Sequence, residues 1–203
     1  MCSASTRSIK ILPGRNKLPA DTNQNRLSSD KILPAINGNV LWLIPSQPQM
    51  SVYREQIQRL SDRFGTVRFP PHLTLGRLPE NFTEKELSRC LRSLTQVVNN
   101  LVSATDSGIE CSTSPYQNLI HALKSSKELH QFQSEIMTLI FGYTPKEEYH
   151  VSLMYGEIGC NEVESEITNL LKRLPKRVNF SKISVIRLNG QPDDWRTLRE
   201  LKF

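Results

Sequence analysis

Two short stretches of the sequence are the most informative about its fold: PPHLTLGRL at residues 70–78 and YHVSLMYG at residues 149–156. Each contains a histidine, an apolar residue, a hydroxyl residue and a second apolar residue in that order, and the two histidines, His72 and His150, stand 78 positions apart. One such tetrapeptide is typical of an ordinary strand. Two copies in a chain of 203 residues indicate a duplicated unit, and the duplication favours function for the pair over a structural role for each.

A common order of elements surrounds the two histidines. Strand, helix, histidine strand and helix follow one another in each half, and the histidine comes 29 residues after Leu43 in the first half and 30 residues after Ile120 in the second. This repeat is one of pattern, not of identity. Hydrophobic periodicity, capping boxes and turn residues predict strands at 40–44, 107–111, 117–124, 178–188 and 195–201 besides the histidine strands, and helices at 49–64, after Thr83, through Leu129–Leu139 and after Asn161.

Strand geometry predicts which of these side chains face the same way. Successive side chains on a strand point to opposite faces, so His72 shares a face with Thr74, and His150 shares a face with Ser152. The apolar residues between and after them face a core. Two such units packed about a pseudo-two-fold axis would bring two imidazole–hydroxyl pairs together across one cleft.

Two imidazoles and two hydroxyls form a recognisable chemical set. Imidazoles with pKa values near 6.5 can hold one proton between them at neutral pH. One can then take a proton from water while the other protonates a departing oxygen. The hydroxyls can donate hydrogen bonds to phosphoryl oxygens. Opening of a strained cyclic phosphodiester by water suits this set and requires no metal.

Zinc binding is the competing function for the histidines. The chain has no HxH or HExxH sequence, and neither tetrapeptide contains a carboxylate. We expect His121 to be a strand residue of the scaffold and His130 to lie on the solvent side of a helix. Trp42 fits a core position better than a base-stacking role.

Composition and charge limit the class of protein. The mean hydropathy is −0.41 and no apolar run has the length needed to span a bilayer, so we expect one soluble domain, with or without a tail. The net charge is +6, but residues 1–39 carry +4 of it and leave +2 for the other 164 residues. A nearly balanced body argues against a long phosphate-tracking groove.

The tail and the cysteines carry weaker expectations. Residues 1–38 are basic and rich in serine, asparagine and proline, which favours disorder, with organelle targeting as the alternative. The predicted folded domain is residues 39–203. No metal-ligand spacing joins the four cysteines, so we expect reduced thiols, although a disulfide stays open because sequence cannot pair Cys2, Cys90, Cys111 and Cys160.

Two such tetrapeptides at this separation resemble the motifs of the 2H phosphoesterase superfamily, and their surroundings resemble its plant and fungal cyclic phosphodiesterase branch. Residues 41–45 look like the first strand of that branch, residues 68–75 are similar to its first motif block, and residues 143–155 are similar to its second. The likeness covers residues 39–203. It implies an α+β fold of two pseudo-symmetric lobes of antiparallel sheet with outer helices and the active-site cleft between them.

The resemblance also implies an activity. Enzymes of this branch hydrolyse nucleoside 2′,3′-cyclic phosphates to 2′-phosphates, and ADP-ribose 1″,2″-cyclic phosphate, a by-product of tRNA splicing, to the 1″-phosphate. The four motif positions are occupied here by His72, Thr74, His150 and Ser152. By analogy within the superfamily, His150 activates water and His72 protonates the leaving oxygen.

Tyr155 matches a tyrosine that lies close to the bound substrate in relatives. It is five residues after His150, so an ideal strand would send it to the opposite face. It can reach the cleft only if the strand ends or curls beyond Met154, where Gly156 would permit a change of direction.

The expected protein is therefore a cytoplasmic monomer that acts on a small cyclic nucleotide or on ADP-ribose cyclic phosphate, without a cofactor, a metal or a membrane. Three alternatives stay open. The first is an RNA-end phosphodiesterase or ligase-like enzyme of the same superfamily, acting on RNA ends. The second is a non-catalytic nucleotide- or RNA-binding module. The third concerns the location in the cell, because the tail could direct the chain to an organelle or the endomembrane system.

Overall fold

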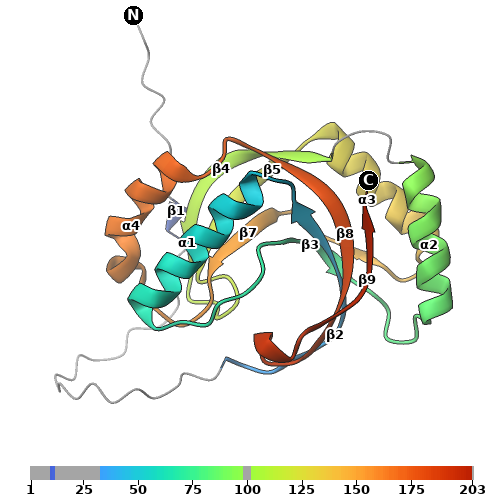
Figure 1. The fold of residues 1–203 in the computed structure, drawn as a ribbon, viewed down its shortest axis with the longest axis horizontal. Helices are drawn as coiled ribbons and strands as arrows, with labels where there is room; N and C mark the ends of the chain where they lie inside the picture. The colour runs from blue at the N-terminus through green and yellow to red at the C-terminus, as the bar shows by residue number, and fades with distance from the viewer. Residues whose placement is uncertain (1–9, 12–32, 98–101, 203) are drawn as a thin grey trace, which may run out of the picture.

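The structure is a computed structural model that describes residues 10–11, 33–97 and 102–202. Helices and strands alternate along the chain (Figure 1), as expected for an α+β fold. The strands are β1 Lys10–Ile11, β2 Ile36–Pro45, β3 Leu73–Arg77, β4 Ser103–Cys111, β5 Leu119–Ser125, β6 Thr144–Pro145, β7 Tyr149–Met154, β8 Arg177–Gly190 and β9 Arg196–Lys202. The helices are α1 Gln49–Phe64, α2 Glu84–Val97, α3 Lys127–Leu139, α4 Cys160–Arg173 and the 3₁₀ turn η1 Pro192–Asp194.

The strands form one sheet with a symmetric order. Neighbouring strands follow the path β1-β4-β5-β7-β3-β2-β8-β9, with β6 added to β3, and β4 also pairs with β8, so the sheet curls into a ring. All pairs are antiparallel except β1–β4. From β4 to β8 the order β4-β5-β7-β3-β2-β8 reads the same from both ends if the two halves of the chain are exchanged, whereas β1, β6 and β9 have no counterparts among the described strands. This confirms the expected duplication, and its centre is the β3–β7 pair.

The helices follow the same symmetry. Figure 1 shows α1 and α4 together on one side of the ring and α2 and α3 together on the other. Exchange of the two halves converts α1 into α3 and α4 into α2, so each pair contains one helix from each half. The two lobes are therefore interlocked. The central strands are β3, which His72 directly precedes, and β7, which contains His150, and they are held from both sides.

The core follows the alternation that the sequence predicts. Leu73 and Val151 are fully buried, and they belong to the large apolar cluster that includes the inner faces of all four α-helices. The opposite face of the sheet carries a smaller apolar cluster around Trp42, formed by β2 and β8. One face of each histidine strand is thus anchored by helices, and the other is left for the site.

Helix ends agree closely with the sequence. Gly65 ends α1 with φ of 64°, in the left-handed region that favours glycine. The capping box before α2 is formed, since the Thr83 N–H donates to Glu86 at 2.9 Å and the Glu86 N–H donates to the Thr83 hydroxyl at 3.3 Å. The start of α4 differs from the expected cap at Asn161, because the helix begins at Cys160 and its cap is Gly159.

One expectation about the cysteines is wrong. Cys111 at the end of β4 is bonded to Cys160 at the start of α4, with Cα atoms 5.8 Å apart, although 49 positions separate them in sequence. Only the fold brings this pair together, so no spacing rule could find it. Cys90 is a buried free thiol, and Cys2 lies outside the described residues.

Most of the predicted N-terminal tail also lies outside the described residues, which omit 1–9 and 12–32. Its disorder, its targeting role and its boundary therefore stay predictions. Leu33 packs in an apolar cluster, and its carbonyl accepts a hydrogen bond from Gln191 at 2.6 Å. In the part of the chain that the structure describes, no helix is both long enough and apolar enough to cross a membrane.

Candidate functional site

The pairing of β3 with β7 brings the two tetrapeptides together. Leu73 lies opposite Val151, and these are equivalent positions of the two copies, so the pseudo-two-fold axis passes between them. In an antiparallel pair the residues on either side of this point then face each other crosswise, His72 near Ser152 and Thr74 near His150. The two histidines are diagonal neighbours, a relation in which Cα atoms lie about 7–8 Å apart.

All four side chains open into one cavity of about 400 Å³. It is walled by apolar and aromatic side chains of β2, β8 and the segment before β9, and by the β6–β7 segment. Among the described residues, no carboxylate lines this cavity, whereas Arg77 and Lys146 do. The cavity therefore suits an anionic ligand with an apolar part.

His72 is fixed by its neighbours. Its ring stacks on Trp42 with centroids 3.5 Å apart and 10° between the planes. Its Nδ1 lies 2.7 Å from the Pro70 carbonyl oxygen; because a carbonyl can only accept, Nδ1 carries the hydrogen and Nε2 is the nitrogen left for chemistry. The histidine is 6% exposed.

Burial lowers the pKa of both histidines. The pKa of His72 falls to about 3 through loss of hydration, partly opposed by the hydrogen bond to Pro70, with further lowering by the nearby charges of His150 and Lys146. The pKa of His150 falls to about 4, again mainly through burial and then through Lys146. Both rings are therefore neutral near pH 7 in the free protein. This differs from the expected pair that shares one proton.

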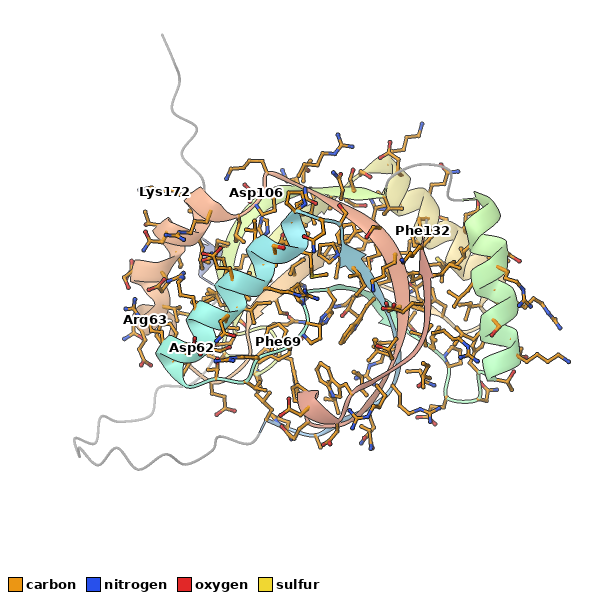
Figure 2. The ribbon with its side chains drawn as sticks, viewed as in Figure 1. Asp62, Arg63, Phe69, Asp106, Phe132 and Lys172 are labelled. Atoms are coloured by element: carbon orange, nitrogen blue, oxygen red, sulfur yellow. A yellow bond between two sulfur atoms is a disulfide. The ribbon has the colours of Figure 1, made fainter. Side chains whose placement is uncertain are left out.

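Tyr155 lines the cavity. The sequence allows this position only if the strand ends or curls beyond Met154. The pairing register of β5 with β7 shifts between Leu119 and Ile120, which lie opposite Met154 and Ser152. This bulge adds one residue to β7 and reverses the alternation beyond it, so Tyr155 returns to the face of His150. Its ring stacks on Phe69 at 3.5 Å, and Figure 2 places Phe69 beside the lower part of α1.

The hydroxyl of Ser152 already has partners in the free protein. It donates to the Tyr116 carbonyl at 3.2 Å, and a hydrogen bond with Ser152 acts on the pKa of Tyr155, which burial raises. A ligand in the cavity would therefore find Ser152 and Tyr155 linked. Thr74 is only partly buried.

Several cavity residues carry no pattern in the sequence. Trp42 lines the cavity at 4% exposure and uses one face for His72, so it combines a core position with contact to the site. Trp195 lies edge-on to it at 5.7 Å, and its Nε1 is buried without a hydrogen-bond partner in the described residues. Tyr116 and Lys146 complete this group. Only the approach of β6 to β3 identifies Lys146, because nothing in its local sequence marks it.

The other two histidines lie elsewhere, as expected. His121 is fully buried: Nδ1 is 2.6 Å from the Tyr53 hydroxyl, and Nε2 is 3.1 Å from Asp106. Figure 2 shows Asp106 at the upper end of α1. The pKa of Asp106 is well below its usual range, mainly because of the hydrogen bond to His121. His130 is an exposed residue of α3.

Metal binding was the competing reading of the histidines. Within residues 10–11, 33–97 and 102–202, no group of three or more His, Cys, Asp or Glu side chains is arranged to hold a metal ion. The two cavity histidines are accompanied by hydroxyls and cations, which are poor partners for a cation.

Comparison with known proteins places the chain. A family model described as cyclic phosphodiesterase-like protein matches residues 37–203. A search of curated protein sequences gives no significant match. Among solved structures, a phosphoesterase superposes with a TM-score of 0.50 at 12% identity, covering 84% of this chain and 98% of its own, which supports the fold.

Two further solved structures superpose less closely. Escherichia coli LigT complexed with ATP has a TM-score of 0.47 at 11% identity, covering 82% of this chain and 97% of its own. Kluyveromyces marxianus Usb1 with uridine monophosphate has a TM-score of 0.40 at 11% identity, covering 79% and 96%.

Proposed function

Because the chain belongs to the cyclic phosphodiesterase-like family, and is thus a phosphodiesterase-type enzyme of the 2H superfamily, we propose that it opens cyclic phosphates by two-histidine general acid–base catalysis without a metal. The proposed substrates are nucleoside 2′,3′-cyclic phosphates, converted to 2′-phosphates, and ADP-ribose 1″,2″-cyclic phosphate, converted to the 1″-phosphate. The latter reaction would link the protein to tRNA splicing.

One observation carries this proposal. The Leu73–Val151 pairing puts the two histidines on a diagonal, on the same face of the sheet and in the same cavity, which no carboxylate of the described residues lines. We propose that a phosphoryl group and one water molecule occupy the part of this cavity between the two imidazoles. The hydroxyls of Thr74 and Ser152 occupy the other diagonal. The Thr74 hydroxyl can donate to a non-bridging oxygen, and the Ser152 hydroxyl can do so when it exchanges the Tyr116 carbonyl for the phosphoryl group.

The water oxygen forms a bond to phosphorus as the bond from phosphorus to the 3′ oxygen breaks. His150 takes the proton that water loses, and His72 gives a proton to the departing oxygen, which yields a 3′-hydroxyl and a 2′-phosphate. Exchange with solvent then removes the added proton from His150 and returns one to His72. Each of the two roles is typically worth ~10²–10⁴ in rate.

The low pKa values of the free protein fit this scheme if the substrate supplies the missing charge. A phosphodiester is an anion, so a bound one favours the charged form of an adjacent imidazole. The Pro70 carbonyl also favours the charged form of His72 through Nδ1, which supports the acid role for this residue. His150 stays neutral and able to accept a proton.

Tyr155 is proposed as a substrate-binding residue. Its hydroxyl interacts with Ser152, and its ring is fixed by stacking on Phe69. It can therefore hold Ser152 in place or donate to the phosphoryl group itself.

The decisive experiment uses uridine 2′,3′-cyclic phosphate (cyclic UMP) and ADP-ribose 1″,2″-cyclic phosphate. EDTA is present, and the products are identified by ³¹P NMR. We expect 2′-UMP and ADP-ribose 1″-phosphate, and we expect His72→Ala and His150→Ala each to lower turnover at least ~100-fold while the fold is retained. Near-normal turnover by either variant would exclude the paired scheme. Loss in EDTA with rescue by Zn²⁺ would favour a metal site.

An RNA oligonucleotide ending in a 2′,3′-cyclic phosphate separates the small-substrate proposal from the RNA-end alternative. The body of the chain carries only +2, so we propose that the small molecule is the better substrate and that a monomer suffices for the reaction. A much higher kcat/KM for the oligonucleotide would reverse this order. Binding of either ligand without turnover would favour the non-catalytic module.

A further inference from the structure

Lys146 is a residue that the two tetrapeptides do not include, yet it lines the cavity together with both histidines. On the basis of this placement, and resting on the proposed function, we propose that Lys146 is a substrate-binding residue whose ammonium group contacts a non-bridging oxygen of the phosphoryl group held between His72 and His150.

The fold delivers Lys146 to the cavity through a short strand. Lys146 directly follows β6, and β6 pairs with β3 so that Pro145 lies opposite Gly76. A Cβ atom at Gly76 would lie 2.2 Å from the Thr144 carbonyl oxygen, so this close approach depends on a glycine. The backbone of Lys146 is fixed from the other side, because its carbonyl accepts a hydrogen bond from Gln133 of α3 at 3.1 Å.

The electrostatic surroundings favour an anion beside Lys146. Burial lowers the pKa of Lys146, and Glu148 opposes this shift. Its charge lowers the pKa of both His72 and His150, and Lys146 lines the same cavity as these two rings. The other cation of the cavity, Arg77, is exposed and donates to the Asn37 carbonyl at 3.2 Å, at the rim rather than between the histidines.

Lys146 also lines a second groove, of about 740 Å³. Gln117 and His150 likewise line both the groove and the cavity. That groove has mixed charge, so it does not repeat the selection for anions that the cavity makes. The charged and titratable side chains that interact with Lys146 are His72, His150 and Glu148. The other charged or histidine side chains that line the cavity or the groove are Arg77, Glu110, Lys124, His130 and Glu147.

A charged donor on the phosphoryl group serves the reaction in two ways. It strengthens binding of the anion, since hydrogen bonds between charged groups are about twice as strong as neutral ones. It also disfavours the imidazolium form of both histidines until the phosphate arrives and neutralises it. The cavity then exchanges a half-buried ammonium for an ammonium–phosphate pair, and the proton can settle on His72.

The test compares Lys146→Met, Lys146→Arg and the control Lys124→Met, whose side chain is exposed in the adjoining groove. Binding of 2′-AMP and of inorganic phosphate is measured by calorimetry at pH 7, and histidine titration is followed by NMR. We expect Lys146→Met to weaken 2′-AMP binding about 10- to 100-fold and to raise the pKa of both histidines. Lys146→Arg should recover most of the affinity, and Lys124→Met should match the wild type.

The outcomes separate this inference from the proposed function. If the wild type does not open cyclic phosphates but Lys146→Met still abolishes phosphate binding, the anion contact stands and the proposed function falls. If the wild type is active and Lys146→Met, correctly folded by its melting temperature, binds 2′-AMP as tightly as the control, the inference is wrong. Unchanged histidine titration in Lys146→Met would also overturn it.

Discussion

Burial of His72 and His150 makes the stability of the protein depend on pH, because it lowers the pKa of each histidine in the folded state. A histidine whose pKa is lower in the folded state than in the unfolded chain binds fewer protons when folded, so its contribution to stability is complete above about pH 6.5 and is lost as the pH falls. For His72 the loss extends toward about pH 3 and for His150 toward about pH 4.

We therefore predict that the free energy of unfolding decreases below pH 6.5, with a limiting slope of about 1.4 kcal/mol per pH unit for each histidine. Urea unfolding at pH 7, 6 and 5 measures this slope. His72→Asn should remove about half of it. Carboxylates such as Asp106, whose pKa is lowered, lose their contribution from about pH 5 downward, so the change between pH 7 and pH 5 comes mainly from the histidines. Equal stability at pH 7 and pH 5 would contradict the burial argument.

The same residues predict a difference between two kinetic profiles. The pH dependence of kcat/KM reports the free enzyme, and that of kcat reports the enzyme–substrate complex. Because the bound anion favours the imidazolium form, we expect the maximum of kcat at a higher pH than the maximum of kcat/KM. Steady-state rates with cyclic UMP between pH 4 and pH 9 provide the comparison. Coinciding maxima would mean that the bound substrate does not raise the pKa values of the two histidines.

At this scale the sequence predicts the reacting groups but not their ionisation. His72, Thr74, His150 and Ser152 are marked by a repeated pattern, and strand alternation alone puts each pair on one face. Their pKa values depend on the Trp42 ring and on Lys146, which the fold brings from other strands. The position of Tyr155 could be predicted only in part. Its side chain faces the cavity because of a bulge in β7, and the sequence is compatible with a bulge there but does not predict one.

At the scale of elements, the contact of β6 with β3 links a scaffold glycine to the site. A side chain at Gly76 would collide with the backbone of Thr144 and with the ring of Tyr143. Thr144 cannot yield without moving β6, and Lys146 is attached to the end of that strand. The sequence predicted both histidine strands but not β6, since a two-residue strand has no periodicity to detect.

Gly76→Ala should therefore destabilise the protein by about 1–3 kcal/mol and lower kcat/KM through displacement of Lys146. Gly65→Ala is the matched control: its φ of 64° makes a side chain unfavourable, but no atom lies within 4 Å of the added Cβ. That variant should lose roughly 1 kcal/mol and keep its kcat/KM. Urea unfolding and turnover of cyclic UMP test both. If the two variants lose activity equally, the loss reflects stability and not β6.

At the scale of the whole molecule, the sheet order and the paired helices make the two halves mutually dependent. Glu166 of α4, 1% exposed, forms ion pairs with Arg59 and Arg63 of α1, and Figure 2 places Arg63 at the end of α1 that adjoins α4. Each half thus contributes one helix to each flank. The repeat in the sequence predicted this symmetry, whereas the ring closed by β4 and β8 has no local signal because it joins distant strands.

The disulfide is the second long-range constraint, and it lies away from the reacting groups. The Cys111–Cys160 bond closes a segment of 49 positions, and a native disulfide of this kind typically contributes about 2–4 kcal/mol by restricting the unfolded chain. Neither cysteine lines the histidine cavity. A cytoplasmic address, which stays a prediction, would expose this bond to reduction, so the reduced form matters for function.

We predict that reduction lowers the melting temperature by about 5–15 °C but changes kcat/KM for cyclic UMP less than twofold at 25 °C. Thermal melting with and without dithiothreitol measures the first effect, after thiol counting confirms the state of the wild type. In the Cys111→Ser, Cys160→Ser double variant the reductant should have no further effect on melting. A large loss of activity in the reduced, still folded protein would contradict this prediction. It would mean that the disulfide between β4 and α4 helps to position the site. The strand pairings offer a route for such an effect, since β4 pairs with β5 and β5 pairs with β7, the strand of His150.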